Sequence, residues 1–422
     1  MLPDLAAIRA EFPSITGAQA TGDLFLDAAG GSQAPRIVAE RIAEYLTTIN
    51  VQLGAGTASS QASGARVESA HRWLETWLGA SEDRAASDRH VAIIGSSASS
   101  LCAMVANAVA RSPVAGRDEI VVGLAGHESN LGPWTRLATL GLTPRWWGAD
   151  RTSGESSIEE LRDLVTERTR IVAVHHVSNI TGEIEDLEEI VAIAHARGAH
   201  VVADGVAFAP HRAMEVDRWG VDAYFFSLYK VFGPELAALA ATPSFLATLE
   251  APNHDFIAPA EIPAAFELGG ASRSGCVGAL AVAEYFAMLA GAPPPSGEGV
   301  SRAVVEAAYA RIEQLEAPLT ERVLEDLARR PAVRVIGPGE MGSSRLPTIS
   351  FVVEGASSKE IAARAGARGL GIRAGHFYAQ RLTSHLGLDP ADGVVRISLA
   401  HTNHPDELDR FEEFLDEVAP RA

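Results

Sequence analysis

Lysine is almost absent from this sequence. Only Lys230 and Lys359 occur, although lysine and arginine together number 35. Arginine can replace lysine in most charged surface roles, but its guanidinium keeps its proton and cannot act as a nucleophilic amine. A lysine retained in such a chain therefore indicates a position that needs an amine. Lys359 stands in SSKE before a predicted helix, where an exposed surface role accounts for it. Lys230 is thus the candidate functional amine.

Cysteine, long apolar segments and positive charge are also scarce. The two cysteines, Cys102 and Cys276, are too few for a disulfide framework or a zinc cluster. No apolar run reaches the about 20 residues of a membrane span, and the start of the chain lacks a basic region followed by an apolar one. We therefore expect a cytoplasmic protein without a membrane partner. The net charge of −19 disfavours nucleic acid, whose phosphates are also negative.

The length of 422 residues exceeds that of one simple core and predicts two domains. The stretch APPPSGEG, residues 292–299, has the proline, glycine and serine content of a linker. We expect a large domain over residues 25–295 and a small C-terminal domain over 296–422. An N-terminal segment, residues 1–24, is expected to pack with the small domain.

The stretch from Val201 to Pro234 holds the main chemical signal. Two short apolar runs read as buried strands, of which one ends at Asp204 and the other, Ala223–Leu228, leads to Lys230. Open α/β sheets bind ligands at the carboxyl ends of their strands. Pyridoxal phosphate (PLP) needs a lysine amine for its Schiff base and a carboxylate that keeps its pyridine nitrogen protonated. The pair therefore predicts a PLP site.

A serine-rich turn predicts where the phosphate of that cofactor binds. VAIIGSSASSLCAMVANAVA reads as a strand, a turn and a helix, and residues 97–99 (Ser-Ala-Ser) begin the helix. Free amides and the helix dipole favour a phosphate at this end. Serine N-capping without a ligand is the alternative interpretation.

Two histidines, His175 and His176, are neighbours on a predicted strand and point to opposite faces. We interpret them as structural or pocket-wall residues and predict no metal site.

These motifs occur in order with FLDAAGGSQAP near the start and VRISLAHTNHPDEL near the end. Together they resemble the class V aminotransferase group of fold-type I PLP enzymes, in particular its cysteine desulfurase-like branch. The resemblance covers nearly the whole chain. It implies an α/β fold, with a mostly parallel sheet sandwiched by helices in the large domain and a smaller α+β C-terminal domain. It also implies a homodimer with shared active sites and an amino-acid substrate.

The resemblance assigns cofactor contacts residue by residue. His127, in GHESNLGPW, would lie over the cofactor ring, although capping of the following helix is an alternative role. Asn179 would bond to the phenolic oxygen, and Gly270 would reach the neighbouring subunit's phosphate through backbone alone, because a threonine is usual there. Ala207 and Tyr229 replace a glutamine and a histidine of desulfurases. The implied contacts are Ser97, Ala98, Ser99, His127, Asn179, Asp204, Ser227, Tyr229, Lys230 and Gly270.

The small domain supplies the substrate contacts that the resemblance implies. Arg396 matches the arginine that clamps the substrate α-carboxylate, a task that suits its planar fork, and Arg373 competes for the same role. In GIRAGHFYAQRL, Tyr378 stands where desulfurases have the cysteine that takes sulfur from the substrate. Persulfide formation needs a thiolate, so a conventional cysteine desulfurase is disfavoured.

The catalytic roles fall to Lys230, Asp204 and His127. We expect lyase-type chemistry, either β-elimination or β-decarboxylation with carbon–carbon bond formation to an aldehyde co-substrate. The segments HVSNITGEI, DGVAFAPHR and FSLYKVFGP are similar to those of PLP-dependent decarboxylative aldolases. Transamination and epimerisation remain alternatives, because a fold does not fix its chemistry. The alternative of another class is a catalytically silent PLP-binding partner protein.

Overall fold

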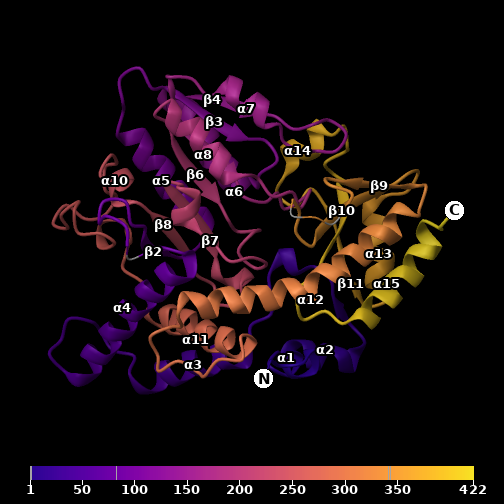
Figure 1. Ribbon diagram of the computed structural model, residues 1–422, viewed down its shortest axis with the longest axis horizontal. Helices are drawn as coiled ribbons and strands as arrows, with labels where there is room; N and C mark the ends of the chain where they lie inside the picture. The colour runs from indigo at the N-terminus through magenta and orange to yellow at the C-terminus, as the bar shows by residue number, and fades with distance from the viewer. Residues whose placement is uncertain (1, 82, 341, 343) are drawn as a thin grey trace.

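The chain folds around a seven-stranded sheet that is covered by helices on both faces (Figure 1). The computed structural model describes residues 2–81, 83–340, 342 and 344–422. The strand order is β2-β8-β7-β6-β5-β3-β4, and β8 runs antiparallel to both of its neighbours while the other pairs are parallel. The expected mostly parallel sheet is confirmed. The strands are β2 Val91–Gly95, β3 Glu119–Gly123, β4 Thr143–Trp147, β5 Thr169–His175, β6 His200–Asp204, β7 Ala223–Ser227 and β8 Ala237–Ala241.

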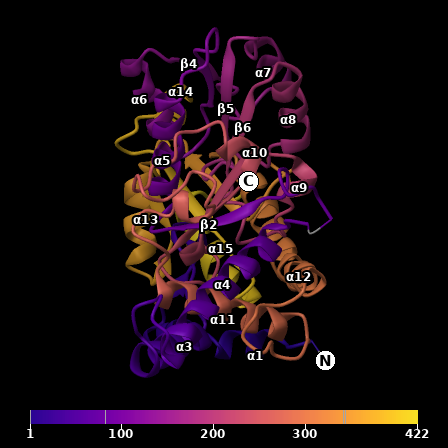
Figure 2. The ribbon, with the colours of Figure 1, turned by 90° about the vertical axis from the view of Figure 1, so that its left-hand side faces the viewer.

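Alternation along the strands divides the core of the large domain into two layers. In β6, Val201 and Ala203 belong to one apolar cluster and Val202 to the other, as a period of two requires. Because both faces are covered, these strands are apolar throughout rather than alternating with polar residues. Figure 2 gives the view along the layers. One face carries α4 Ala58–Leu78, α7 Ile158–Leu164, α8 Leu187–Ala196, α9 Val216–Trp219, α11 Arg273–Leu289 and α12 Arg302–Ala328, and the other carries α5 Ala98–Arg111, α6 Glu128–Arg136 and α10 Pro243–Leu246.

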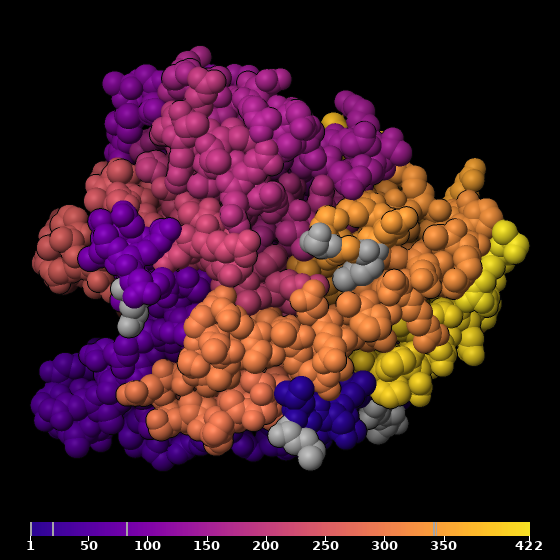
Figure 3. Space-filling view, in the orientation of Figure 1, coloured from indigo at the N-terminus to yellow at the C-terminus, as the bar shows by residue number. Residues whose placement is uncertain are grey.

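The C-terminal part forms a second, smaller layer that α12 connects to the first (Figures 1 and 3). Its four-stranded antiparallel sheet has the order β12-β13-β10-β9 and packs against helices through its own apolar cluster. Short strand β1 pairs with β11, which joins the start of the chain to this layer. The elements are β1 Leu24–Phe25, β9 Val333–Ile336, β10 Thr348–Val353, α13 Ser358–Gly366, β11 Leu370–Gly371, β12 Arg373–Gly375, α14 Gln380–His385, β13 Val394–Ser398 and α15 Pro405–Val418.

The N-terminal segment contacts both parts of the molecule. It contains α1 Leu5–Ala10 and α2 Pro13–Thr21, and α3 Arg36–Thr48 follows it. Arg9 forms a 2.7 Å ion pair with Glu407 of the small domain, while the ring of Phe12 packs edge-on against Tyr285 of α11. The segment therefore contacts more than the small domain to which the sequence assigned it.

Local caps and turns set three element boundaries. Thr57 accepts the Ser60 N–H and starts α4 at Ala58, and Ser272 caps the start of α11 at Arg273. The expected strand Ala223–Leu228 stops at Ser227, and Lys230 lies in a 3₁₀ turn, Leu228–Lys230. In the described part of the chain, no helix is long and apolar enough to cross a membrane.

A buried arginine ties the two domains together beside the strand ends. The side chain of Arg345 is fully buried and donates to the carbonyl oxygens of Thr181 at 3.4 Å and Thr348 at 2.8 Å, and also to that of Pro338. Thr181 belongs to the large domain, whereas the other two carbonyls belong to the small one. In the same junction Leu346 N–H donates to Gly182 O at 2.9 Å. This junction fixes the turn after β5, which also carries Asn179.

We predict that Arg345→Met lowers the free energy of unfolding by about 3 kcal/mol, because it leaves buried carbonyl oxygens without donors. The measurement is urea unfolding of the purified protein followed by circular dichroism. Arg334→Met is the matched control, since Arg334 is partly exposed and donates to one carbonyl, that of Thr152. We expect that control to change stability by less than about 0.5 kcal/mol. Equal losses in the two variants would contradict the role of Arg345.

Candidate active site

The predicted acid and amine meet at the carboxyl edge of the large sheet. Asp204 ends β6, and Lys230 follows the neighbouring parallel strand β7. Both line one pocket, as do six other residues predicted to contact the cofactor. Ser97 and Gly270 do not line it. The lining residues are Ala98, Ser99, His127, Ser129, His175, Val177, Asn179, Asp204, Val206, Ala207, Ser227, Tyr229 and Lys230.

Asp204 is a buried carboxylate whose charged form would be stabilised by a positively charged ligand group. Its side chain is buried and accepts a hydrogen bond from Val206 N–H at 2.9 Å. Burial raises the pKa of Asp204 to about 6, although the Val206 N–H and the charge of Lys230 oppose that rise. A protonated ring nitrogen next to this carboxylate would favour its charged form. The residue therefore fits the pyridine end of PLP.

Lys230 is partly buried, and the pKa of its amine is lower than usual. Burial and then the positive charge of Arg396 lower the pKa of Lys230 to about 8, while Asp204 and Asp27 oppose the decrease. A lower pKa increases the share of neutral amine near pH 7, and the neutral amine is the nucleophile. The lysine is therefore suited to bond to an aldehyde cofactor.

The amino end of α5 offers a phosphate site at the same pocket. Ser97 caps the helix by accepting the Ser100 N–H at 3.1 Å, so the capping role considered for this serine is what the geometry shows. In the described part of the chain, no group accepts from the N–H of Ala98 or Ser99, and both residues face the pocket. Ser99 Oγ lies 2.7 Å from Ser129 Oγ. Free amides and hydroxyls at a helix N-terminus match the needs of a phosphate group.

His127 combines the two roles that the sequence left open. Its Nδ1 accepts the Ser129 N–H at 3.0 Å, which caps α6, while the ring lines the pocket. Burial, followed by the charges of Lys230 and Arg396, lowers the pKa of His127 to about 4. The ring is therefore neutral at pH 7, with its proton on Nε2 because Nδ1 is an acceptor. Tyr378 covers it, with ring centroids 5.1 Å apart.

Asn179 retains hydrogen-bonding capacity for a ligand. Its Nδ2 donates to Phe377 O at 2.8 Å, which joins the turn after β5 to the small domain. Its Oδ1 is buried and has no hydrogen-bond partner among the described residues. Buried polar atoms are normally paired, so an unpaired one in a pocket suggests a missing ligand.

Both candidate clamp arginines bind the same carboxylate. Arg396 is buried, and its Nη2 lies 2.6 Å from Asp27 Oδ1; Arg373 is exposed, and its Nη1 lies 3.2 Å from Asp27 Oδ2. The guanidinium carbon of Arg396 stands 3.8 Å from the centroid of the Phe377 ring. Asp27 thus occupies the carboxylate position of both arginines. Neither arginine lines the Lys230 pocket, but the charge of Arg396 acts on both Lys230 and His127.

No thiol lies at the expected position of a sulfur acceptor. Tyr378 is 66% exposed and has a left-handed backbone, with φ of 60°. Cys102 is buried against Asn130, and burial raises its thiol pKa; burial also raises the pKa of Cys276 to about 12. Both cysteines are therefore protonated and shielded.

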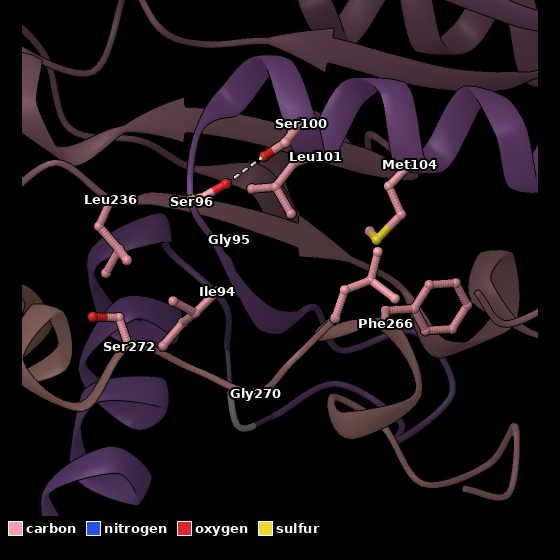
Figure 4. A pocket seen from close by; sticks show the side chains of 11 residues that line it. Ile94, Gly95, Ser96, Ser100, Leu101, Met104, Leu236, Phe266, Gly270 and Ser272 are labelled. Atoms are coloured by element: carbon pink, nitrogen blue, oxygen red, sulfur yellow. Dashed lines mark hydrogen bonds between the residues drawn. The ribbon is translucent and has the colours of Figure 1, made fainter. Parts of the chain in front are cut away.

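Gly270 lies in a separate cavity on the other side of the α5 N-terminus (Figure 4). In that view Ser96 and Ser100 approach each other at 3.1 Å, and Met104 and Phe266 form an apolar wall. Gly270 is exposed and has φ of +78°. Within one chain it does not meet Lys230, so its expected contact with a neighbouring subunit's phosphate remains a prediction.

Sequence reasoning gave no site role to Asp27, Phe377 or Ser129. Asp27 stands in the recognised motif FLDAAGGSQAP, but its arginine partners are more than 340 residues away in sequence. The Phe377 ring contact depends on a left-handed turn, in which Phe377 itself has φ of 45°. Only the position of Ser129, two residues after His127 at a helix start, could have indicated its role.

Comparisons with known proteins agree with this geometry. The sequence matches the family "Aminotransferase class-V" over residues 24–411. The aminotransferase-like protein FGM3 of Gibberella zeae is 35% identical over 413 residues, covering 96% of this chain and 95% of that protein. The cysteine desulfurase-like protein ustD of Aspergillus flavus is 31% identical over 319 residues, covering 72% of this chain and 68% of that protein.

A solved structure supports the same conclusion. The apo cysteine desulfurase from Thermococcus onnurineus NA1 superposes with a TM-score of 0.83 at 25% sequence identity, covering 99% of this chain and 98% of that one. Members of the matched family depend on PLP, and the residues at the strand ends, the α5 N-terminus and Asn179 fit that cofactor. The chain therefore belongs to the class-V aminotransferase family and is a cysteine desulfurase-like PLP enzyme.

Proposed function

We propose that the protein is a lyase that acts at Cβ of a small α-amino acid and does not transfer sulfur. The observation that carries this proposal is that Tyr378, whose ring centroid lies 5.1 Å from that of His127, stands where the resemblance to desulfurases places the sulfur-accepting cysteine. Neither cysteine supplies a substitute, because Cys102 is buried in α5 and Cys276 is buried in α11. Without a sulfur acceptor, the retained acid–base and carboxylate-binding groups favour bond breaking that ends in an organic product.

Two reactions of this class suit the site. In β-elimination the substrate loses a leaving group from Cβ, and in β-decarboxylation an acidic amino acid loses its side-chain carboxylate. The second reaction leaves a carbon nucleophile that can attack an aldehyde co-substrate. This version is favoured because the three chain segments that resemble decarboxylative aldolases each contribute residues to the pocket. Transamination and epimerisation need the same groups and remain the alternatives.

The residues of this chain perform complementary tasks. Bound PLP supplies an electron-accepting ring for carbanionic chemistry at Cα and Cβ. Lys230, with its lowered pKa, removes or returns a proton at the substrate Cα. The Asp204 carboxylate holds a proton on the ring nitrogen by charge attraction. The neutral ring of His127 packs over the cofactor position, and its Nε2–H is available to donate a hydrogen bond.

Arg396 holds the substrate carboxylate in the proposed complex. Its guanidinium is planar, buried and backed by the Phe377 ring, so its rotation is restricted. Asp27 now fills part of its fork, so the incoming carboxylate must share or replace that contact. A fixed carboxylate sets the rotation of the substrate about Cα and thereby selects the bond that breaks.

We also propose that the active form is a homodimer with shared sites. The support is the position of Gly270, which lies outside the pocket of its own chain and on an exposed segment. A homodimer would bring this segment to the phosphate end of the other site.

We predict that sodium borohydride attaches PLP covalently to the peptide that contains Lys230. Peptide mass spectrometry of the reduced holoenzyme measures this. Lys230→Ala should lose about 1,000-fold in turnover, because the general base is removed, whereas Lys359→Ala should react normally. An adduct on Lys359, or full turnover by Lys230→Ala, would contradict the assignment. A holoenzyme that leaves every amino acid unchanged, with or without aldehydes, would point instead to a silent binding protein.

We predict that a Cys102→Ala/Cys276→Ala double variant keeps turnover within about twofold of the parent, because neither buried thiol takes part in the reaction. Product formation is followed by mass spectrometry with a panel of amino acids and aldehydes. Thermal unfolding serves as the control for packing losses in the core. Trapping of a persulfide on either cysteine, with loss of activity in the variant, would show that sulfur transfer occurs.

We predict that Arg396→Lys lowers kcat/KM by about 100-fold, because lysine keeps the charge but loses the two-point grip. Arg373→Lys is the matched control, since Arg373 is exposed and binds the other oxygen of Asp27; we expect less than about a fivefold effect. Steady-state kinetics and substrate titration measure both. If the two results are reversed, Arg373 is the clamp.

A further inference from the structure

His175 lies beside Asp204 on the neighbouring strand. The two residues are register partners in the parallel pair β5–β6, so their side chains project from the same face of the sheet. Both line the Lys230 pocket. The backbone adds a tie, because His176 N–H donates to Asp204 O at 2.8 Å. The histidine that the sequence suggested as a pocket-wall residue is thus the immediate neighbour of the predicted cofactor acid.

Two glycines leave space for the imidazole of His175. A Cβ on Gly123 would come within 3.2 Å of His175 Nδ1, and one on Gly126 within 3.4 Å. The side chain is only 2% exposed. Neither ring nitrogen has a hydrogen-bond partner among the described residues. A polar ring buried without hydrogen bonds is costly, so its presence indicates a task that an apolar residue would not perform.

A second carboxylate, that of Glu185, contacts the histidine. Glu185 Oε1 lies 3.1 Å from His175 Nε2, is buried, and lacks a hydrogen-bond partner among the described residues. Burial and then the charge of Glu185 raise the pKa of Glu183, two residues earlier, to about 8. Glu185 is thus the carboxylate that contacts this side of the imidazole.

The other groups around Asp204 do not replace the histidine. Cys102, Tyr224 and Tyr229 face the carboxylate, and its charge contributes to raising the pKa of each, so all three are neutral. Lys230 is positive but is the residue that bonds to the cofactor. When its amine is used in that bond, His175 is the remaining titratable side chain among the described residues that favours the charged form of Asp204.

We propose that His175, oriented by Glu185, is a positioning residue that keeps Asp204 ionised and directed at the ring nitrogen of the cofactor. The inference rests on the PLP site but not on which bond the enzyme breaks. The physical basis is that a buried carboxylate alone prefers to be protonated, and a positive charge on a neighbouring imidazole opposes that preference. Glu185 orients the ring through the 3.1 Å contact of its Oε1 with His175 Nε2.

The test uses holoenzyme that contains PLP labelled with ¹⁵N in its ring. The ¹⁵N chemical shift, recorded from about pH 5 to 8 where proteins tend to be most stable, reports the protonation of that nitrogen without any turnover. We expect His175→Leu to increase the unprotonated share at every pH and to lower kcat by about tenfold, with KM changed by less than about twofold. Glu185→Gln, which keeps the shape of the side chain, should shift the nitrogen in the same direction by a smaller amount.

The adjacent residue provides the matched control. His176 is also a buried histidine, but it faces the other side of the sheet and stacks on Phe208 with centroids 3.7 Å apart. His176→Leu should leave the ¹⁵N shift unchanged, whatever its effect on stability. If His175→Leu and Glu185→Gln both keep the parental shift, His175 is structural and the proposal is wrong, even if kcat falls. If His175→Leu does not fold, Glu185→Gln alone decides by the same criterion. The ¹⁵N shift does not depend on which bond the enzyme breaks. A failure of the proposed lyase function would therefore leave this measurement valid and can be told apart from a failure of the His175 proposal.

Discussion

The attraction between one buried acid and one amine at adjacent strand ends organises this active site. Asp204 and Lys230 are brought together by the parallel pairing of β6 and β7, not by proximity in the chain. Burial works against both charges, and each partly offsets the penalty of the other. The surrounding groups follow from this placement. The N-terminal residues of α5 and the neutral His127 line the same pocket, and the buried Arg396 adds positive potential from the small domain.

The two domains share the site through a small number of contacts. Asn179 bonds to the backbone of Phe377, and Arg396 donates to the backbone oxygen of Asn179 at 3.2 Å. Arg345 donates to the carbonyl oxygen of Thr181 in the same turn of the large domain. The candidate carboxylate clamp, Arg396, therefore belongs to one domain and the candidate amine, Lys230, to the other. With these roles, substrate selection would depend on the rigidity of this junction as well as on the pocket walls.

The sequence predicted those features that depend on local pattern. The apolar runs ending at Asp204 and before Lys230, and the serine turn before α5, each indicated their elements directly. The missed features depend on tertiary neighbours. The pairing of Asp27 with Arg396 spans 369 residues. The environment of His175 depends on two glycines of other segments. The start of α4 at Ala58 has no clear sequence signal, because its first turns contain small residues without an apolar face.

The scarcity of lysine has a practical consequence for handling the protein. Once the cofactor occupies Lys230, Lys359 carries the one remaining side-chain amine of the chain. Lys359 is exposed at the start of α13, on the outer part of the small domain. Amine-directed reagents would then couple a dye, a surface or a polymer at a single side chain, apart from the chain's terminal amine. The resting cofactor would itself act as the protecting group.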